Sequence, residues 1–564
     1  MYRSRLGGKL DDITLDYVSS ISDDTDIVFY DIIGTQAHSI MLHENKLLTK
    51  KELKKILSAL EDLKKGKISQ PDFEPEDIHE LIESLVVKKI GIETGGKMHT
   101  ARSRNDQVSL DIRMKIRDDI NILCQCIIDT IKELISLAKQ HTGTIMPLYT
   151  HLQQAQVGVF SHYLISYADS LFRDLDRFLE IYQRINQNPL GAGPVGGTSL
   201  PIDRNSTAKM LGFTGIVENS IDATSSRDFV AEYIASVAIL MTNLSRISED
   251  FIIWSSSEFS FLQLSDDFAS PSSVMPQKKN PDILELTRGK TSQIIGYVTS
   301  VLSTTKGLSS GYSRDLQQIK SSIWSSSKIS ITALIVIKSM LSTIIINKDN
   351  MRKATEDGYL VALDLAESLV KLGIPFRTSH MIVGKLVQIA SMDRKNLNEL
   401  TLDELNSINI KGIKPGKLMD LIQNTSVTLS LKERKSKGSS GLGEQKRMLT
   451  HRTKKITSYS IKVKKQKEFI KKLRFYIKII FVIMLISAVT VTNSKSVFAD
   501  DIEKFASKLF HHYEYDDKIS NYLKSFFSFG KNGDKNSFNG AINNPKVYLK
   551  KQKSSIKLKS KNKL

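Results

Sequence analysis

The chain has only two cysteines, Cys124 and Cys126, among its 564 residues. This scarcity excludes a framework of disulfide bonds and a four-cysteine zinc module, and it is typical of proteins in a reducing compartment. The two cysteines are two positions apart in a run that we expect to be helical, so their side chains lie on different faces of that helix. We therefore expect small buried side chains there and no metal site.

Proline is scarce as well, at 12 residues, and the 30 glycines are far too few for a collagen-like chain. Hydrophobic residues make up 40% of the chain and charged residues 25%. These shares exclude a wholly disordered or purely coiled-coil protein. At this length, a globular protein with a large core is expected.

Acidic residues are too few to balance the basic ones, which leaves a net charge of +19. The excess is local, because residues 461–564 contain 23 Lys and Arg but only 8 Asp and Glu, and the rest of the chain carries about +4. A basic tail is more often a solvated arm than a surface for nucleic acid or an anionic membrane. We expect no nucleic-acid partner.

Three long runs, 106–141, 216–270 and 312–357, contain neither Gly nor Pro. In the first two, apolar residues recur at steps of three and four, which predicts amphipathic helices. Helices of about thirty residues extend roughly 45 Å and need partners along their whole length. We therefore predict a mainly α, long-helix bundle in an oligomer. The apolar positions of the first run include Ile116, Ile120, Leu123, Ile127, Ile131, Leu134 and Ala138.

Four parts are predicted along the chain. Residues 1–105 form an N-terminal helical domain, 106–350 the central bundle, 351–460 a small helical domain, and 461–564 a basic tail with an apolar segment at 475–491. Three interruptions, 94–107, 147–156 and 265–281, are rich in polar and turn residues. Each lies near an end of a predicted long helix, where helical bundles build sites from several segments.

Two interpretations of the tail stay open. Its uncharged stretch, 479–491, is shorter than the roughly 18 to 20 residues of a membrane-spanning helix. Basic residues precede it and small ones follow at Val497 and Ala499, the order of a secretory signal peptide. The tail either associates with a membrane or is an unrelated secreted sequence joined by fusion or frame error. We favour the second and expect the chain from 461 onward to be dispensable.

The interruptions contain the sequences GKMHTARSRNDQ at 96–107, YTHLQ at 149–153 and SSVMPQKKNPD at 272–282. Together with 191–204 (GAGPVGGTSLPIDR) and 373–380 (GIPFRTSH), they resemble the argininosuccinate lyases of the aspartase and fumarase superfamily. The resemblance covers about residues 1–460. The superfamily as a whole shares only the Ser-Ser-x-Met-Pro loop, whereas TARSRNDQ and MPQKKNPD are specific to this member.

The resemblance implies the superfamily's mainly α bundle, assembled as a homotetramer whose active sites are each shared between three subunits. It also implies a small-molecule substrate and a cytoplasmic enzyme of arginine biosynthesis. The expected reaction is the reversible anti-elimination of argininosuccinate to arginine and fumarate through a carbanion, with no cofactor and no metal.

The resemblance assigns the general base to Ser272. Removing a proton beside a carboxylate puts further negative charge on that carboxylate, so the site needs fixed positive groups. Lys278 supplies one. The sequence Asn280-Pro281 predicts a helix start with Asn280 as cap, whose free N–H groups would face an anion. A lone serine beside Pro271 would more simply form a turn.

The resemblance assigns protonation of the leaving nitrogen to His151, paired with Glu285. A carboxylate partner raises the pKa of an imidazole and makes its cationic form available near neutral pH. A single histidine of this kind is otherwise most often a structural residue.

Binding residues follow from the same resemblance, and Arg offers a bidentate fork for carboxylates. The plain alternative for Arg227 is a surface ion pair with Asp228. The residues assigned to the fumarate half are Arg104, Asn105, Thr150, Arg227 and Asn280. Those assigned to the arginine half are Ser20, Asp24, Tyr312, Gln317 and Lys320.

Three positions depart from the family pattern: Pro271 and Leu148 replace glycines, and Val157 stands where proline is common. None of these removes a reactive group. Two other functions stay open: a sister lyase acting on adenylosuccinate, aspartate or fumarate, and a non-catalytic, crystallin-like protein on the same fold. Fumarate release from each substrate distinguishes them.

Overall fold

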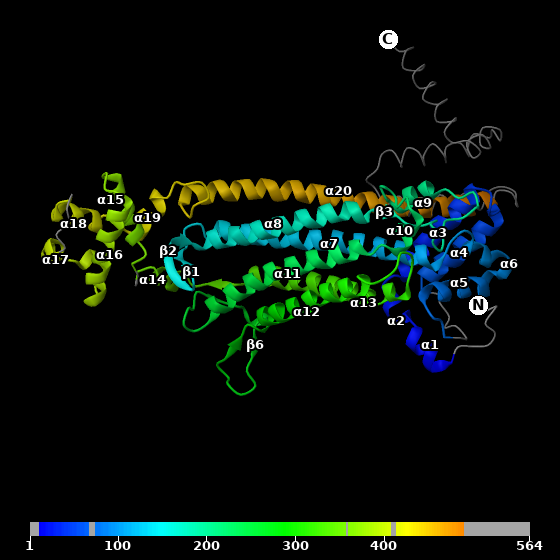
Figure 1. Cartoon of the computed structure of the whole chain (residues 1–564), viewed down its shortest axis with the longest axis horizontal. Helices are drawn as coiled ribbons and strands as arrows, with labels where there is room; N and C mark the ends of the chain where they lie inside the picture. Colours follow the sequence, from blue (N-terminus) through cyan, green and yellow to red (C-terminus); the bar gives the residue numbers. More distant parts are fainter. Residues whose placement is uncertain (1–10, 67–73, 357–358, 408–412, 490–564) are drawn as a thin grey trace, which may run out of the picture. The chain divides into compact units, whose positions relative to one another are not determined.

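The computed structural model of the chain describes residues 11–66, 74–356, 359–407 and 413–489, with 472–489 as backbone alone. The chain divides into two units, Met1–Phe481 and Val482–Leu564, and the first contains nearly all of the described residues. Most of these are helical (Figure 1), which confirms the prediction of a mainly α fold.

The N-terminal helices pack around α3, which is buried along nearly its whole length. The start of α4 is fixed by a capping box between Thr49 and Glu52, and Asp77 caps α5. These elements are α1 (Asp12–Val18), α2 (Ile21–Asp24), α3 (Val28–Glu44), α4 (Lys50–Lys64), α5 (Ile78–Ile90), α6 (Ile92–Gly95) and the 3-10 helix η1 (Gly96–His99).

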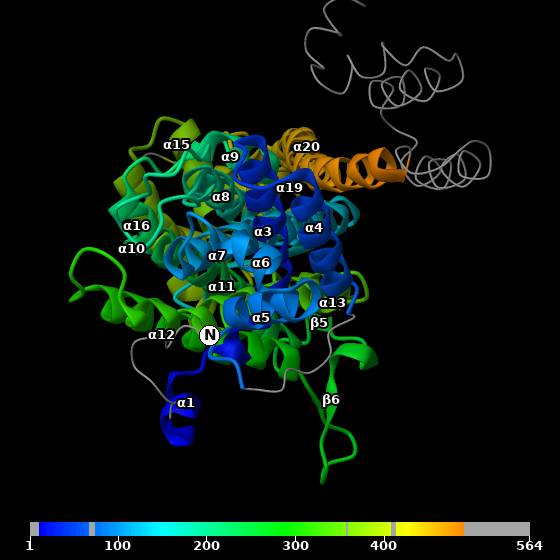
Figure 2. The ribbon, with the colours of Figure 1, turned by 90° about the vertical axis from the view of Figure 1, so that its right-hand side faces the viewer.

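Five long helices form the bundle: α7 (Arg104–Gln140), α8 (Phe160–Ile185), α11 (Asp228–Ser255), α12 (Asp282–Thr305) and α13 (Lys320–Leu341). α7 packs against α8 and α13, and α11 against α8 and α12 (Figures 1 and 2). The apolar stripe predicted for 106–141 is fully buried in α7, as Ile116, Ile120 and Leu123 show at 0% exposure. The run 312–357 yields only the 22-residue α13, flanked by shorter elements.

Short elements connect the bundle helices, and a separate apolar cluster that includes Leu369, Leu386 and Leu418 forms the core of the C-terminal helices. The strands are β1 (Ile145–Thr150), β2 (Gln153–Val159), β3 (Gln187–Asn188), β4 (Gly215–Ile216), β5 (Leu262–Gln263), β6 (Ser270–Pro271), β7 (Lys279–Asn280) and β8 (Ile345–Ile346). They pair as β1–β2, β3–β4, β5–β8 and β6–β7. The remaining helices are α9 (Arg204–Leu211), α10 (Ser220–Ser225), η2 (Asp266–Phe268), η3 (Arg314–Gln317), α14 (Lys348–Lys353), α15 (Ala362–Lys371), α16 (Phe376–Met392), η4 (Leu397–Glu399), α17 (Leu402–Ser407), α18 (Pro415–Gln423) and α19 (Val427–Glu433).

The helix α20 (Leu442–Val489) crosses residue 460 without a break. Its first part packs on the bundle, with Val463 and Ile470 only 0% and 4% exposed. Gln466 Nε2 donates a hydrogen bond to Asn121 Oδ1 (2.8 Å). The four-part division of the chain stays a prediction. The predictions for the apolar segment 475–491 and for the rest of the tail also stay predictions, because the side chains of 475–489 and all of residues 490–564 lie outside the described residues.

The prediction that Asn280 caps the helix that follows it is wrong. Asn280 belongs to β7 and pairs with Ser270 of β6, so its backbone is extended. Pro281 takes the cap position, and α12 begins at Asp282 without a side-chain cap. Pairing of the two loop strands thus takes precedence over the capping preference of asparagine.

One described helix, α11, is long and apolar enough to cross a membrane by length and composition. However, 56% of its apolar window is buried, and Val237, Met241 and Leu244 belong to the bundle core. It is a core helix.

We predict that a chain ending at residue 481 keeps its thermal stability, whereas one ending at residue 460 loses it. The shorter chain lacks two buried side chains, Val463 and Ile470, which together stabilise the fold by about 3 to 6 kcal/mol. Calorimetry of both chains measures the difference. Equal melting temperatures would show that the start of α20 alone suffices.

Candidate active site

Asp24 lies at the centre of a buried polar group that joins three elements. Its carboxylate accepts hydrogen bonds from Ser20 Oγ (2.8 Å) and from the backbone N–H of Ile78 (3.3 Å), both at Oδ2. Its Oδ1 pairs with the ammonium of Lys320, and both side chains are 1% exposed. Helix α2 and the first residues of α5 and α13 therefore meet at one carboxylate.

The segment just before α5 connects this group to α7. Asp77 caps α5 and accepts a hydrogen bond from Arg104 Nη1 (2.8 Å). The carbonyl of Glu76 accepts the N–H of Ser20 (2.9 Å), and its carboxylate pairs with Arg314. Four charged side chains from three parts of the chain are thus held in one network.

Tyr312 and Gln317 lie beside this network. Gln317 Nε2 donates to Tyr312 Oη (2.8 Å). Burial raises the pKa of Tyr312, and the charges of Arg227, Arg314 and Asp77 also act on it. Tyr312 therefore links the start of α11, where Arg227 lies, to the network around Asp77.

Arg227 is a buried cation, and some of its hydrogen-bond donors have no partner among the described residues. It is 3% exposed, and its Nη1 donates to the carbonyls of Thr224 (3.2 Å) and Ser226 (2.7 Å). Its Nε and Nη2 have no partner among the described residues. Burial lowers the pKa of Arg227 to about 10, so it stays charged at neutral pH. The alternative of a surface ion pair with Asp228 is wrong, and the free donors fit an anionic group.

Asn105 follows Arg104 at the start of α7 and faces another loop. Its Nδ2 donates to the carbonyl of Pro194 (2.9 Å).

The β1–β2 hairpin carries Thr150 and His151 at its tip. Thr150 pairs with Gln153, and the two residues between them, His151 and Leu152, both have positive φ, at +56° and +58°. This is the left-handed backbone of a two-residue hairpin turn, which usually contains Asn or Gly. Holding bulkier residues there costs about 1–3 kcal/mol each, and such strain is concentrated at functional sites. Both Thr150 and His151 are exposed.

Ser272 begins the loop between β6 and β7, which projects from the bundle (Figures 1 and 2). Its Oγ accepts hydrogen bonds from the backbone N–H groups of Val274 (3.3 Å) and Met275 (3.0 Å). Lys278 is exposed near the other end of the same loop. Asn280 is half-buried in β7, and Glu285 is exposed in the first turn of α12.

These predicted residues lie at two ends of the bundle. The 37 residues of α7 extend roughly 55 Å from Arg104 toward the β1–β2 hairpin. The 28 residues of α11 extend roughly 42 Å from Arg227 toward the segment that leads to Ser272. One end holds Ser20, Asp24, Arg104, Asn105, Arg227, Tyr312, Gln317 and Lys320. The other holds Thr150, His151, Ser272, Lys278, Asn280 and Glu285.

Three buried residues of kinds that can bind a metal ion lie close together in the N-terminal part of the chain. Ligand atoms of Asp31, His79 and Asp111, all buried, lie within 4.8 Å of one another. His79 Nδ1 is 3.4 Å from Asp31 Oδ1 and 3.8 Å from Asp111 Oδ2. Burial alone lowers the pKa of His79, but the attraction of Asp31, with smaller effects of Asp77 and Asp111, raises it to about 9. The imidazolium thus faces the Asp31 carboxylate, while burial and the charge of Asp31 raise the pKa of Asp111.

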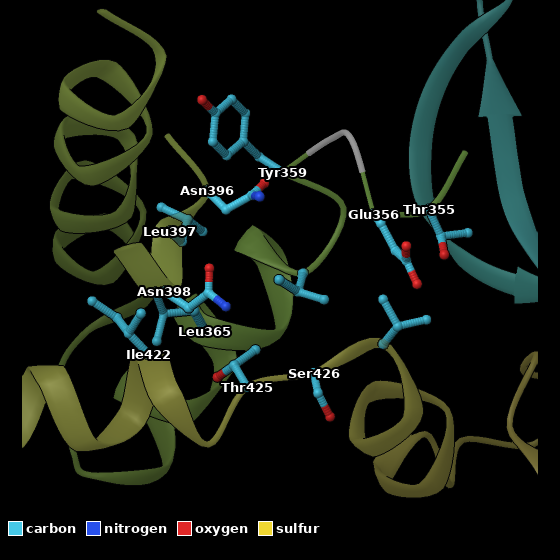
Figure 3. Close-up of a pocket in the computed structure, with 12 residues that line it drawn as sticks. Thr355, Glu356, Tyr359, Leu365, Asn396, Leu397, Asn398, Ile422, Thr425 and Ser426 are labelled. Atoms are coloured by element: carbon cyan, nitrogen blue, oxygen red, sulfur yellow. The ribbon is translucent and has the colours of Figure 1, made fainter. Parts of the chain in front are cut away.

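A cavity of about 250 Å³ lies among the C-terminal helices (Figure 3). Its wall combines apolar residues such as Leu365 and Ile422 with polar ones such as Tyr359, Asn396 and Asn398. None of the predicted site residues lines it.

Sequence reasoning missed the organising segment before α5. Glu76, Asp77 and Ile78 contact α2, α7 and η3, yet they belong to no motif singled out from the sequence. The available signal was the helix start itself, because Asp77 is followed three residues later by Glu80, as in a capping box.

The chain is similar to known proteins along most of its length. Residues 5–296 match the family model described as lyase, and residues 359–431 match the model for the argininosuccinate lyase C-terminal region. The chain is 64% identical over 460 residues to argininosuccinate lyase of Nitrosopumilus maritimus, an alignment that covers 81% of this chain and 95% of that protein. It is 40% identical over 412 residues to argininosuccinate lyase of Methanocaldococcus jannaschii, covering 72% and 85%.

Solved structures show the same fold. EDDS lyase in complex with formate matches with a TM-score of 0.75 at 26% identity, covering 85% of this chain and 97% of that one. Class II fumarase from Schistosoma mansoni matches with a TM-score of 0.61 at 16% identity, covering 70% and 89%. At that identity the second likeness concerns the fold alone.

We predict that His79 stabilises the fold mainly below pH 6.5. Its pKa is raised from 6.5 to about 9 on folding, so its contribution of about 3 kcal/mol is complete below pH 6.5 and is lost as the pH rises through 9. The free energy of unfolding, measured by denaturant titration between pH 6 and 10, should fall by that amount more in the natural chain than in His79→Gln. Parallel curves would refute the charged state of His79.

Proposed function

The chain belongs to the argininosuccinate lyase family, the carbon–nitrogen lyases of arginine biosynthesis, and on that premise we propose how its side chains divide the reaction. Its activity is that of an argininosuccinate lyase acting on a small-molecule substrate. In the elimination, a C–H bond beside a succinyl carboxylate breaks, the C–N bond to the guanidinium group breaks, and a C=C bond forms. One proton leaves the carbon and one reaches the leaving nitrogen, so side chains can supply every group required.

The end of the bundle around Asp24 binds the substrate. Argininosuccinate carries three carboxylates together with cationic amino and guanidinium groups, so its site needs several cations and few acids. The observation that carries this assignment is Arg227, a buried cation whose Nε and Nη2 donors have no partner among the described residues. Buried donors of this kind gain most from an anionic acceptor.

Arg227, Arg104, Asn105, Thr150 and Asn280 are proposed to hold the succinyl half. For the arginine half, Asp24 is proposed to face the cationic amino group and Lys320 the carboxylate of the amino acid. Ser20, Tyr312 and Gln317 are the proposed neutral hydrogen-bonding partners of the same half.

Ser272 is proposed as the general base. A serine hydroxyl is a poor base unless its alkoxide is stabilised. The two N–H groups that donate to Ser272 Oγ, from Val274 and Met275, are the groups that would stabilise that alkoxide. Lys278 adds a positive charge from the same loop and stabilises the carbanion as charge develops on the neighbouring carboxylate.

His151 is proposed to protonate the leaving nitrogen, with Glu285 as its partner. No described contact joins the two residues within one chain. The strained turn at His151 and Leu152 supports the role, because it presents the imidazole at an exposed tip where a second chain can reach it.

We further propose a homotetramer with shared active sites. Roughly 55 Å of rigid α7 lies between Arg104 and the hairpin, so one chain cannot bring both halves of the site to one substrate. Exposed apolar side chains along the bundle provide surfaces for association. They include Ile239 of α11, Leu286, Ile295 and Leu302 of α12, and Ile335 of α13.

We propose the cytoplasm as the place of action. Both cysteines are free thiols, and a reducing compartment keeps them so. Association of the tail with a membrane stays a prediction.

Replacing Ser272 by Ala should lower kcat by at least about a thousandfold with little change in folding, since the chemical step loses its base. The measurement follows fumarate absorbance with argininosuccinate as substrate. Ser273→Ala is the matched control, because it changes the neighbouring hydroxyl in the same loop and should keep most of the activity.

The outcome that contradicts this assignment is retention of kcat in Ser272→Ala. Absence of fumarate formation by the natural chain would contradict the proposed reaction as a whole.

Mixing two inactive variants should restore activity if sites are shared. Ser272→Ala damages one end of the bundle, and Lys320→Met damages the other. When the two are unfolded and refolded together, some sites combine the intact Ser272 of one copy with the intact Lys320 of another. Activity should therefore appear in the mixture but in neither variant refolded alone. Its absence, with the assembly formed, would contradict shared sites.

A further inference from the structure

Asp106 is a buried carboxylate whose two oxygens serve different segments. It lies at the third position of α7 and is 0% exposed. Its Oδ1 accepts the backbone N–H of Ser103 (3.0 Å), which completes the capping box of α7. Its Oδ2 accepts the backbone N–H groups of Gly191 and Gly193, both at 2.9 Å. A helix cap needs only the first of these contacts.

The segment held by Oδ2 has a backbone that requires glycine. Gly191 and Gly193 have φ values of +88° and +64°, where other residues are strained. A Cβ added to Gly193 would lie 2.9 Å from the carbonyl oxygen of Gly197. The N–H of Gly197 in turn donates to the carbonyl of Ala192 (2.9 Å). The loop 191–197 is therefore a closed turn, attached to α7 through Asp106.

This loop lies between residues proposed to bind substrate. The carbonyl of Pro194 accepts a hydrogen bond from Asn105 Nδ2 (2.9 Å). A Cβ on Gly311 would lie 3.9 Å from Cγ2 of Val195, so the loop also reaches the residue before Tyr312. The tip of the loop, from Pro194 to Gly196, is exposed.

Two arginines lie near the Asp106 carboxylate and favour its ionised form. Arg102 and Arg204 are the cations that act on it from the two flanking segments. Arg204 Nε donates to the carbonyl of Leu190 (3.0 Å), which fixes the entry to the same loop. Burial raises the pKa of Asp106 to about 6, against the lowering effect of its N–H donors. At neutral pH it is an ionised acceptor, as three N–H donors require.

We propose that Asp106 is a positioning residue of the lyase reaction: through Gly191 and Gly193 it holds the loop 191–197 against Asn105 and Gly311, and so sets the placement of the substrate-binding side chains. It does not touch substrate itself. The inference rests on the proposed function, because it concerns binding residues assigned there.

Asp106→Asn tests the proposal. An amide oxygen can accept only part of the hydrogen bonds that the carboxylate accepts, and its NH2 group would face an N–H donor. We expect KM for argininosuccinate to rise about tenfold or more while kcat changes by less than about threefold, since the chemistry at Ser272 is untouched.

Gly193→Ala perturbs the same loop without changing Asp106, and so keeps the test decisive should Asp106→Asn fold poorly. The added methyl group meets the carbonyl of Gly197, so this variant should show the same rise in KM. The double variant should be little worse than either single one, because both changes release one loop.

Asp203→Asn is the matched control. Asp203 caps α9 by accepting the N–H of Asn205 (2.8 Å) and is exposed. It caps the next helix after the loop, and because Asn caps a helix about as well as Asp, the change should leave both KM and the melting temperature nearly unchanged.

The inference is overturned if folded Asp106→Asn or Gly193→Ala keeps the natural KM and loses only thermal stability. It is also overturned if kcat falls and KM does not rise. Failure of the proposed function is a separate result, because the natural chain would then form no fumarate.

Discussion

The length of α7 constrains everything else in this molecule. A rigid helix of 37 residues, roughly 55 Å long, begins at the residues proposed to bind substrate and ends beside the hairpin that carries His151. The 28 residues of α11 impose a separation of roughly 42 Å between Arg227 and the segment that leads to Ser272. A single chain therefore presents the proposed site residues at two ends of one bundle, and the proposed homotetramer would bring the two sets together.

The two ends are built by different physical means. At the end proposed to bind substrate, charged side chains are fixed by partners: buried Asp24 by Lys320, half-buried Arg104 by Asp77, and buried His79 by Asp31. Breaking such buried pairs is costly, so this end is preorganised before substrate arrives. At the other end, the proposed proton donor His151 lies at the exposed tip of a hairpin and the proposed base Ser272 lies in a projecting loop. Among the described residues, a strained turn positions the first and local backbone hydrogen bonds position the second.

The long helices and the family of the chain were predictable from the sequence. The buried stripe of α7 follows from apolar spacing at Ile116, Ile120 and Leu123, and the argininosuccinate lyase resemblance rested on long, specific motifs. Local rules failed where strand pairing intervened, as at Asn280. That the chain past residue 460 is dispensable stays a prediction, and the burial of Val463 and Ile470 was not foreseen with it. The roles of Asp77 and Asp106 depend on contacts between distant segments, which no local pattern contains. Whether the predicted site residues act as assigned is a question for the variants.

The most direct test of the central claim is the mass of the species that turns over substrate, measured by sedimenting the enzyme through a layer of argininosuccinate while fumarate absorbance is recorded. Shared sites predict that fumarate forms only in the zone of the assembled, multi-copy species, and that dilution to single chains abolishes turnover. Fumarate formation that migrates with the mass of one chain would contradict the account.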